Sequence, residues 1–267
     1  MAARPDVPGA AASRVPDEAA PRIPPFRGNV LGEARVQLEL AALLGSQVHR
    51  GVGVPHGDGA PVVLVPGFGA GDVSLAVLRA WLRRIGHRTY RSGIAWNVDC
   101  SEAAVRRLDR RVSDVAERSG RPVALIGHSR GGLLAHAVAV RRPSRVRAVI
   151  TLGSPLSSPF DASVLTLAAV GWARLGQSLW RPARPQCLTT SCPCAFGADL
   201  RRVGPVPLTS IRTSEDGIVR PESCVAPAGG GPGSGADPGA VSNVVVRGSH
   251  LGLCVNAAVY REIAHAL

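Results

Sequence analysis

The chain has 267 residues, 45% of them hydrophobic, and a formal net charge of +12. A chain of this length and apolar content can bury a substantial core, which excludes wholesale disorder. The longest apolar run, within residues 162–173, is shorter than the roughly 20 residues that a membrane-spanning helix needs. Length predicts one large domain or two small ones.

The positive charge comes from arginine alone, because the sequence has 31 Lys+Arg positions and no lysine. One interpretation is an anionic partner such as nucleic acid or a lipid surface. The other is a compositional preference for Arg, Ala, Gly and Pro, as GC-rich coding produces. The arginines are spread along the chain in pairs, such as Arg83-Arg84, with no basic block interleaved with aromatic residues. This favours composition over nucleic-acid binding, while contact with a membrane surface stays an alternative.

Residues 1–27 contain six prolines and few groups that pack, so a flexible leader is predicted there. This segment lacks the apolar centre of a secretory signal, so we expect a cytoplasmic protein with reduced thiols. The cysteines at 187, 192 and 194 do not have the spacing of a common zinc site, and no metal is expected. A disulfide in this segment stays an alternative if the protein is exported.

Helical patterns and short apolar runs alternate along most of the chain. Strands rich in Val, Ile and Leu that alternate with helices of 10–15 residues form βαβ units. The pattern therefore predicts an α/β fold with a mainly parallel sheet and right-handed crossovers. The expected helices are 31–44, 74–85, a helix opening at Ser101, 131–140 and 255–266, and the expected strands are 61–65, 87–91, 122–126, 146–152, 208–212 and 241–246.

Three details of these elements are open to test. The first helix is expected because Val36, Leu38, Leu40, Leu43 and Leu44 lie among good helix formers. Asp72 or Ser74 is expected to cap the second helix. Residues from about 157 to 204 interrupt the pattern and are expected to form a lid with an apolar, Trp-containing helix. A helix packed in the core is the alternative for that segment.

The sharpest motif is Gly127-His128-Ser129-Arg130-Gly131, a G-x-S-x-G sequence between a predicted strand and a predicted helix. In this context the serine sits on a tight, strained turn that exposes its hydroxyl at the carboxyl edge of the sheet. A side chain at Gly127 or Gly131 would collide with the neighbouring strand or helix. The following helix directs its N–H groups at developing negative charge. The alternative, a glycine-rich turn with an incidental serine, is disfavoured by this context.

A serine hydroxyl is a weak nucleophile until a base takes its proton. His250 is the best placed of the seven histidines, because it lies between small residues just after strand 241–246. His128 is adjacent to the serine, where its ring cannot easily reach the hydroxyl, and His136 falls within a helix. His250 is therefore the candidate base.

Asp216 is the candidate acid that would accept the Nδ1–H bond of His250 and fix its tautomer. It follows strand 208–212, at the carboxyl end of a strand. Glu215 is the neighbouring competitor. Gly217 is expected to allow the tight turn that aims Asp216 inward, which favours Asp216 over Glu215.

Two backbone amides are candidates for an oxyanion hole. The residue after the nucleophile supplies one, the N–H of Arg130. The loop after the first strand, residues 65–69, supplies the other, for which we choose the N–H of Phe68. Pro66-Gly67 is equally a plain strand-ending turn, so this motif is weak alone and stronger beside Ser129.

Taken together, these motifs resemble α/β-hydrolases of the lipase and esterase type and are most similar to bacterial ones. The resemblance covers the chain from about Gly57 to its carboxyl end, with the lid region least alike. It implies one hydrolase domain over 28–267, a Ser129–Asp216–His250 triad, a Phe68/Arg130 oxyanion hole and no metal or cofactor. The segments that carry it are 57–61, 65–68, 125–129, 150–155, 215–219 and 248–252.

Arg130 departs from the pattern, because such enzymes often carry a neutral residue there. Its guanidinium either biases the site toward anionic esters or packs outward. If it acts on the substrate, Arg130→Leu is expected to leave the hydrolysis of neutral esters nearly intact.

We therefore expect a serine hydrolase that cleaves carboxylic esters, with lipid-like acyl esters preferred, through an acyl-enzyme. The expected partner is a small-molecule or lipid ester rather than nucleic acid. Two alternatives stay open: an acyltransferase that uses the same triad, and a non-catalytic binding protein on a hydrolase fold.

Overall fold

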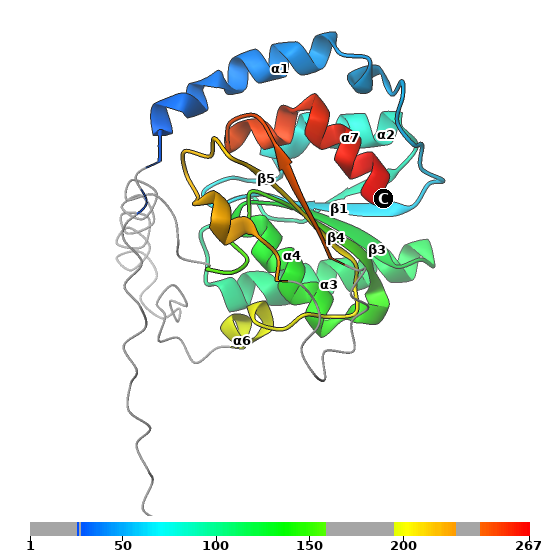
Figure 1. Cartoon of the computed structure of the whole chain (residues 1–267). Coiled ribbons are helices and arrows are strands. Elements are labelled where there is room, and N and C mark those ends of the chain that lie inside the picture. The colour runs from blue at the N-terminus through cyan, green and yellow to red at the C-terminus, as the bar shows by residue number, and fades with distance from the viewer. Residues whose placement is uncertain (1–25, 27, 159–194, 228–240) are drawn as a thin grey trace, which may run out of the picture.

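A parallel six-stranded sheet occupies the centre of the computed structural model (Figure 1), which describes residues 26, 28–158, 195–227 and 241–267. The strand order is β2-β1-β3-β4-β5-β6, and all five neighbouring pairs are parallel. The strands are β1 Pro61–Val65, β2 Arg88–Arg91, β3 Val123–His128, β4 Val146–Leu152, β5 Leu208–Thr213 and β6 Val241–Val246. The predicted α/β class is confirmed, and the predicted leader and most of the predicted lid lie outside the described residues.

Helices cover both faces of the sheet. In Figure 1, α1, α2 and α7 lie on one side of it, and α3, α4 and α6 lie on the other. Residues alternate between the faces along β1, where Val62 and Leu64 join one apolar core and Val63 and Val65 the other. The helices are η1 Val30–Arg35, α1 Val36–Gly45, η2 Val48–Arg50, η3 Asp72–Leu75, α2 Ala76–Arg84, α3 Ser101–Ser119, α4 Arg130–Arg141, η4 Pro143–Arg145, α6 Phe196–Leu200, η5 Pro221–Cys224, η7 Leu251–Val255 and α7 Ala257–Ala266.

The leucines of the first helix differ in their burial. Leu43 is buried, but Leu38 and Leu44 are 73% and 52% exposed. The helix also begins with a 3-10 turn, η1, in which Leu31 is 89% exposed. The inner side of this segment contacts the apolar core through Leu43 and the partly buried Val36 and Leu40, and it also carries the buried Glu33.

The predicted cap of the second helix is wrong. The residue before α2 is Leu75, which makes no side-chain cap bond. The Asp72 carboxylate instead accepts hydrogen bonds from Ser92 N (3.0 Å), Ser92 Oγ (2.7 Å) and Gly93 N (3.0 Å). Ser74 Oγ donates to the Gly71 carbonyl at 2.8 Å. Asp72 therefore fastens the loop that leaves β2, a long-range contact that no local pattern reveals.

The state of the cysteines differs in part from the expectation. Cys100 is disulfide-bonded, so the expectation of reduced thiols is wrong for this residue. Disulfides persist mainly in oxidising compartments, so this bond weighs against a reducing one. Cys224 and Cys254 are buried thiols, and burial raises the pKa of Cys254 to about 12, which leaves it unreactive. Among the described residues, no helix is both long enough and apolar enough to cross a membrane.

Candidate active site

The turn between β3 and α4 holds Ser129 in a strained conformation. Its φ and ψ are 51° and −124°, and it is the one non-glycine residue with a positive φ in the described part of the chain. Such a conformation costs about 1–3 kcal/mol and persists only where the surroundings impose it. Here Ser129 N donates to the Leu152 carbonyl at 2.7 Å, which ties the turn to the end of β4. The serine therefore stands at the carboxyl edge of the sheet.

The glycines of the motif make this turn sterically feasible. A Cβ at Gly127 would lie 2.4 Å from Gly132 N, and a Cβ at Gly131 would lie 2.3 Å from the Val65 carbonyl oxygen. Both distances are far inside van der Waals contact. The first collision is with helix α4 and the second with strand β1, the two kinds of neighbour that the sequence predicts.

Asp216 and His250 come together from separate loops. His250 Nδ1 lies 2.6 Å from Asp216 Oδ2, and the two side chains are 2% and 1% exposed. The other oxygen, Oδ1, accepts hydrogen bonds from Ile218 N (2.9 Å) and Val219 N (2.7 Å). These backbone bonds fix the carboxylate so that Oδ2 faces the imidazole.

Glu215, the competing acid, points elsewhere. Its carboxylate pairs with the Arg35 guanidinium at 2.7 Å, and both side chains are more than a third exposed. The geometry therefore favours Asp216, and not Glu215, as the partner of His250.

His128 contacts the loop of the candidate base, His250. Its Nε2 lies 3.1 Å from the His250 carbonyl oxygen, and the two rings are 4.9 Å apart between centroids. Because a carbonyl only accepts, Nε2 carries the proton. Burial, reinforced by the neighbouring His250, lowers the pKa of His128 to about 3, so the ring is neutral. His128 therefore holds the base loop as an uncharged donor.

The acid and base loops also meet the sheet edge beside the serine. Thr213 Oγ1, at the end of β5, donates to the Gly248 carbonyl at 2.6 Å. A Cβ at Gly153, the residue after β4, would lie 2.9 Å from His250 Nδ1. Since Ser129 is bonded to Leu152, the nucleophile turn and the base loop pack against the same strand end.

The loop after β1 borders the serine on its other side. A Cβ at Gly67 would lie 3.3 Å from the Ser129 Cβ, so the backbone next to Phe68 closely approaches the nucleophile. Asn97 holds this loop: its Nδ2 donates to the Pro66 carbonyl at 2.7 Å, and its own carbonyl accepts from Gly69 N at 3.1 Å. Sequence analysis did not identify Asn97, because no spacing or motif marks it.

The Arg130 side chain is buried and makes hydrogen bonds within the protein. The residue is 9% exposed, and its guanidinium donates to Asn97 Oδ1, to the Asn97 carbonyl (3.1 Å), to the Asp99 carbonyl and to Ser101 Oγ (3.2 Å). The side chain thus connects the nucleophile turn to the residue that holds the Phe68 loop. This geometry favours a structural role for the guanidinium over contact with an anionic substrate.

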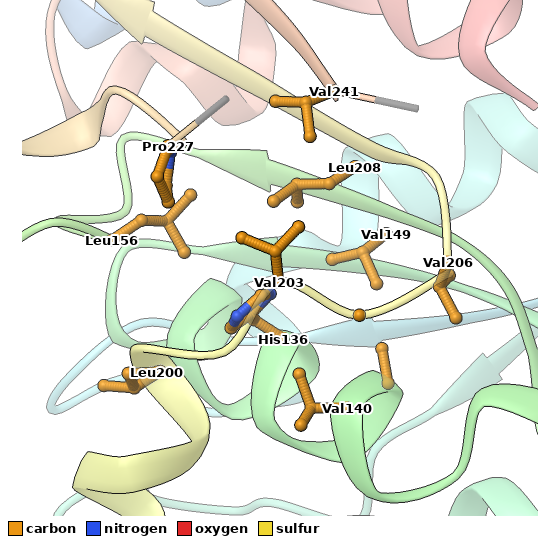
Figure 2. A pocket seen from close by; sticks show the side chains of 12 residues that line it. His136, Val140, Val149, Leu156, Leu200, Val203, Val206, Leu208, Pro227 and Val241 are labelled. Carbon is orange, nitrogen blue, oxygen red and sulfur yellow. The ribbon is translucent and has the colours of Figure 1, made fainter. Parts of the chain in front are cut away.

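A small apolar cavity lies on the α4 face of the sheet, where the first residues of β5 and β6, Leu208 and Val241, are part of its lining (Figure 2). Its volume is about 20 Å³, room for about one water molecule and far too little for an acyl chain. His136 Nε2 donates to the Arg202 carbonyl at 3.1 Å at its rim, and burial lowers the pKa of this histidine. The size of this cavity therefore does not suit a substrate pocket. The side chains labelled in Figure 2 are His136, Val140, Val149, Leu156, Leu200, Val203, Val206, Leu208, Pro227 and Val241.

Comparison with known proteins agrees with this architecture. The family model described as the alpha/beta hydrolase fold matches residues 101–228. Together with the parallel sheet and its helical layers, this match confirms the predicted α/β-hydrolase fold. No curated protein matches the sequence.

Solved structures of similar fold share little sequence with this chain. A monoacylglycerol lipase from Paleococcus ferrophilus is 16% identical over 80% of this chain and 97% of its own, with a TM-score of 0.52. A soluble variant of the monoglyceride lipase from Saccharomyces cerevisiae, in complex with a substrate analogue, is 12% identical over 79% and 88%, with a TM-score of 0.54. A structure from the metagenome-derived lipolytic enzymes LipS and LipT is 16% identical over 80% and 95%, with a TM-score of 0.53. These likenesses show the fold.

Proposed function

We propose that this chain is a serine hydrolase of carboxylic esters that works through a covalent acyl-enzyme. Ser129 Oγ attacks the ester carbonyl while His250 takes its proton, and His250 then protonates the departing alcohol. Water attacks the acyl-serine, again with His250 as base, and releases the carboxylic acid. Asp216 orients the imidazole and stabilises its charged form, while the N–H groups of Phe68 and Arg130 bind the oxyanion.

One observation carries this proposal: a buried Asp216–His250 hydrogen bond of 2.6 Å beside a serine held at φ 51°. A strained serine and a buried acid–base pair both require support from the surrounding structure, and a fold that needed neither would not retain both. With Nδ1 bound to Asp216, Nε2 is the nitrogen left for the proton of the serine. The preferred substrates are lipid-like acyl esters, following the resemblance of the motifs to lipases and esterases.

Replacement of the nucleophile tests the proposal directly. Ser129→Ala is expected to abolish both the turnover of short p-nitrophenyl esters and labelling by a fluorophosphonate probe. Ser74→Ala is the matched control, because Ser74 Oγ is bonded to the Gly71 carbonyl on the exposed start of η3. It should leave both signals unchanged. Labelling retained in folded Ser129→Ala would exclude Ser129 as the nucleophile.

The same preparation separates the alternatives. An ester panel of increasing acyl length identifies the substrate class once labelling is established. Product analysis with a competing alcohol distinguishes hydrolysis from acyl transfer, because a transferase yields the new ester instead of the acid. A folded wild-type protein that no probe labels would support a non-catalytic binding protein.

A further inference from the structure

The N-terminal helices reach the candidate active site from outside the motifs. We call residues 29–45, which comprise η1 and α1, the N-terminal arm; Figure 1 shows α1 lying across the side of the sheet that carries α2 and α7. Glu33 lies on the inner side of this arm and is only 5% exposed. Its carboxylate accepts hydrogen bonds from Gly217 N (2.9 Å), His250 N (3.1 Å) and Leu251 N (2.9 Å).

The position of these three donors gives Glu33 a specific task. Gly217 follows the candidate acid directly, while His250 is the candidate base itself and Leu251 its neighbour. One carboxylate therefore bridges the acid loop and the base loop, which leave different strands. A buried carboxylate is stable only when donors replace the water that it has lost, and these backbone N–H groups do so.

A second carboxylate of the arm, six residues further along the chain, makes a similar contact. Glu39 accepts hydrogen bonds from Ser249 N at 2.7 Å and from Ser249 Oγ at 3.1 Å. Ser249 precedes the base in the chain. The arm thus holds three consecutive amides of the base loop, from Ser249 to Leu251.

In both loops, glycines leave the space that the arm occupies. A Cβ at Gly252 would lie 1.2 Å from Glu39 Oε2, and a Cβ at Gly217 would lie 2.4 Å from the Asn29 carbonyl oxygen and 3.0 Å from Glu33 Oε1. Gly217 is not among the glycines with a positive φ. The close approach of the arm is a further reason for a glycine at this position, beside the turn that the sequence predicts.

From these contacts we infer that Glu33 is a positioning residue that holds the acid and base loops in register with each other. The inference rests on the proposed function and adds a residue that the motifs do not contain. His250 is then fixed at three points: Glu33 binds its N–H, His128 binds its carbonyl, and Asp216 binds Nδ1. Without Glu33, the loops lose their common anchor, and a displacement of about 1 Å at a catalytic group can lower the rate about 10²-fold.

The test compares Glu33→Gln with wild type and with two further variants. Glutamine has nearly the same shape but lacks the charge and one acceptor oxygen, so it cannot serve all three donors. We expect kcat for p-nitrophenyl esters and the rate constant of fluorophosphonate labelling to fall about tenfold or more, with KM changed less than twofold. Glu33→Asp keeps the charge but has a shorter side chain. Its kcat and labelling rate constant should lie between those of wild type and Glu33→Gln. The control is Asp109→Asn, which removes the ion pair with Arg142 (3.0 Å) on an exposed surface.

A second readout does not depend on activity. Hydrogen exchange in peptides covering 214–219 and 247–252 should become faster in Glu33→Gln and stay unchanged in Asp109→Asn. Faster exchange in both loops, together with the fall in kcat, supports the inference. Wild-type exchange in folded Glu33→Gln, a wild-type kcat, or a loss that appears only in KM would overturn it.

The two proposals fail in different ways. If the wild-type protein is not labelled at Ser129, the hydrolase proposal fails, while the exchange measurement still decides whether Glu33 holds the loops. If Glu33→Gln does not fold, Glu39→Gln tests the same anchor through Ser249, with faster exchange in 247–252 and a lower kcat expected. Unchanged exchange and kcat in that variant would overturn the inference.

Discussion

Arg130→Leu removes a guanidinium that hydrogen-bonds to Asn97, Asp99 and Ser101 while leaving the backbone N–H of residue 130 in place. Hydrogen bonds to a charged donor contribute about 1.5–3 kcal/mol each, and buried acceptors left without donors cost about 1–3 kcal/mol each. The contributions overlap in one network, so we expect a loss of about 3 kcal/mol in the free energy of unfolding. For a domain of this size, that lowers Tm by about 10 °C.

The effect on turnover follows from Asn97. This residue is bonded to Pro66 and Gly69, on either side of Phe68, so its displacement moves the Phe68 N–H. Loss of one oxyanion donor lowers kcat by about 10²-fold or more. Displacement of a donor lowers kcat by less, because part of the hydrogen bond is kept. We therefore expect kcat of Arg130→Leu to fall by about 10- to 100-fold for every ester.

The assay compares a neutral p-nitrophenyl ester with one that carries a carboxylate on its acyl group, below the Tm of the variant. If the guanidinium is structural, both values of kcat/KM fall together and their ratio stays within about twofold. Arg130→Lys is the control, because an ammonium keeps the charge but cannot match the forked geometry of the guanidinium. It should lose activity as well. Intact neutral-ester hydrolysis, with a selective loss of the anionic ester, would refute this reasoning.

Two further outcomes are expected. Asp216→Asn should lower kcat by roughly 10³- to 10⁴-fold with KM little changed, because the amide no longer fixes the His250 tautomer; steady-state kinetics on p-nitrophenyl esters check this, and a loss below tenfold would contradict the role. Burial lowers the pKa of His128 from 6.5 to about 3, so between these pH values only the unfolded chain takes up its proton. Stability is complete above pH 6.5 and falls by up to about 1.4 kcal/mol per pH unit below it. Urea unfolding across this window should show a shallower pH dependence for His128→Asn than for wild type; equal slopes would contradict the assignment.

The strands were predictable because their signal is local. Parallel strands covered on both faces are continuous apolar runs, as in 61–65. The strands 61–65, 146–152 and 241–246 begin and end in the structure where the sequence predicts. The nucleophile turn is local too, since its glycines and serine lie within five residues. Helix starts were less predictable: Asp72 looks like a cap but binds Ser92, because its loop folds back on a later one.

The supporting residues of the site were not predictable from patterns. Glu33 lies among polar residues and looks like a solvated side chain, and Asn97 follows no motif. Their roles depend on contacts between residues far apart in the sequence. Asn97 contacts Pro66, about 30 residues away, and Glu33 contacts His250, about 200 residues away. The glycine at position 252 is a usable sign, because a glycine that no turn requires indicates close approach of another segment.

The division of the interior by the sheet has a consequence for the distance between nucleophile and base. The helix that follows Ser129 is anchored in the core that contains Leu134, whereas the turn that follows His250 is anchored through Leu253 in the core on the opposite face. Each core can relax without the other, since substitutions in separate packing units act almost independently. A cavity opened on one side is therefore expected to perturb the loop anchored in that core more than the loop anchored in the other. The distance between Ser129 and His250 therefore depends on the packing of both apolar cores, which the sheet separates.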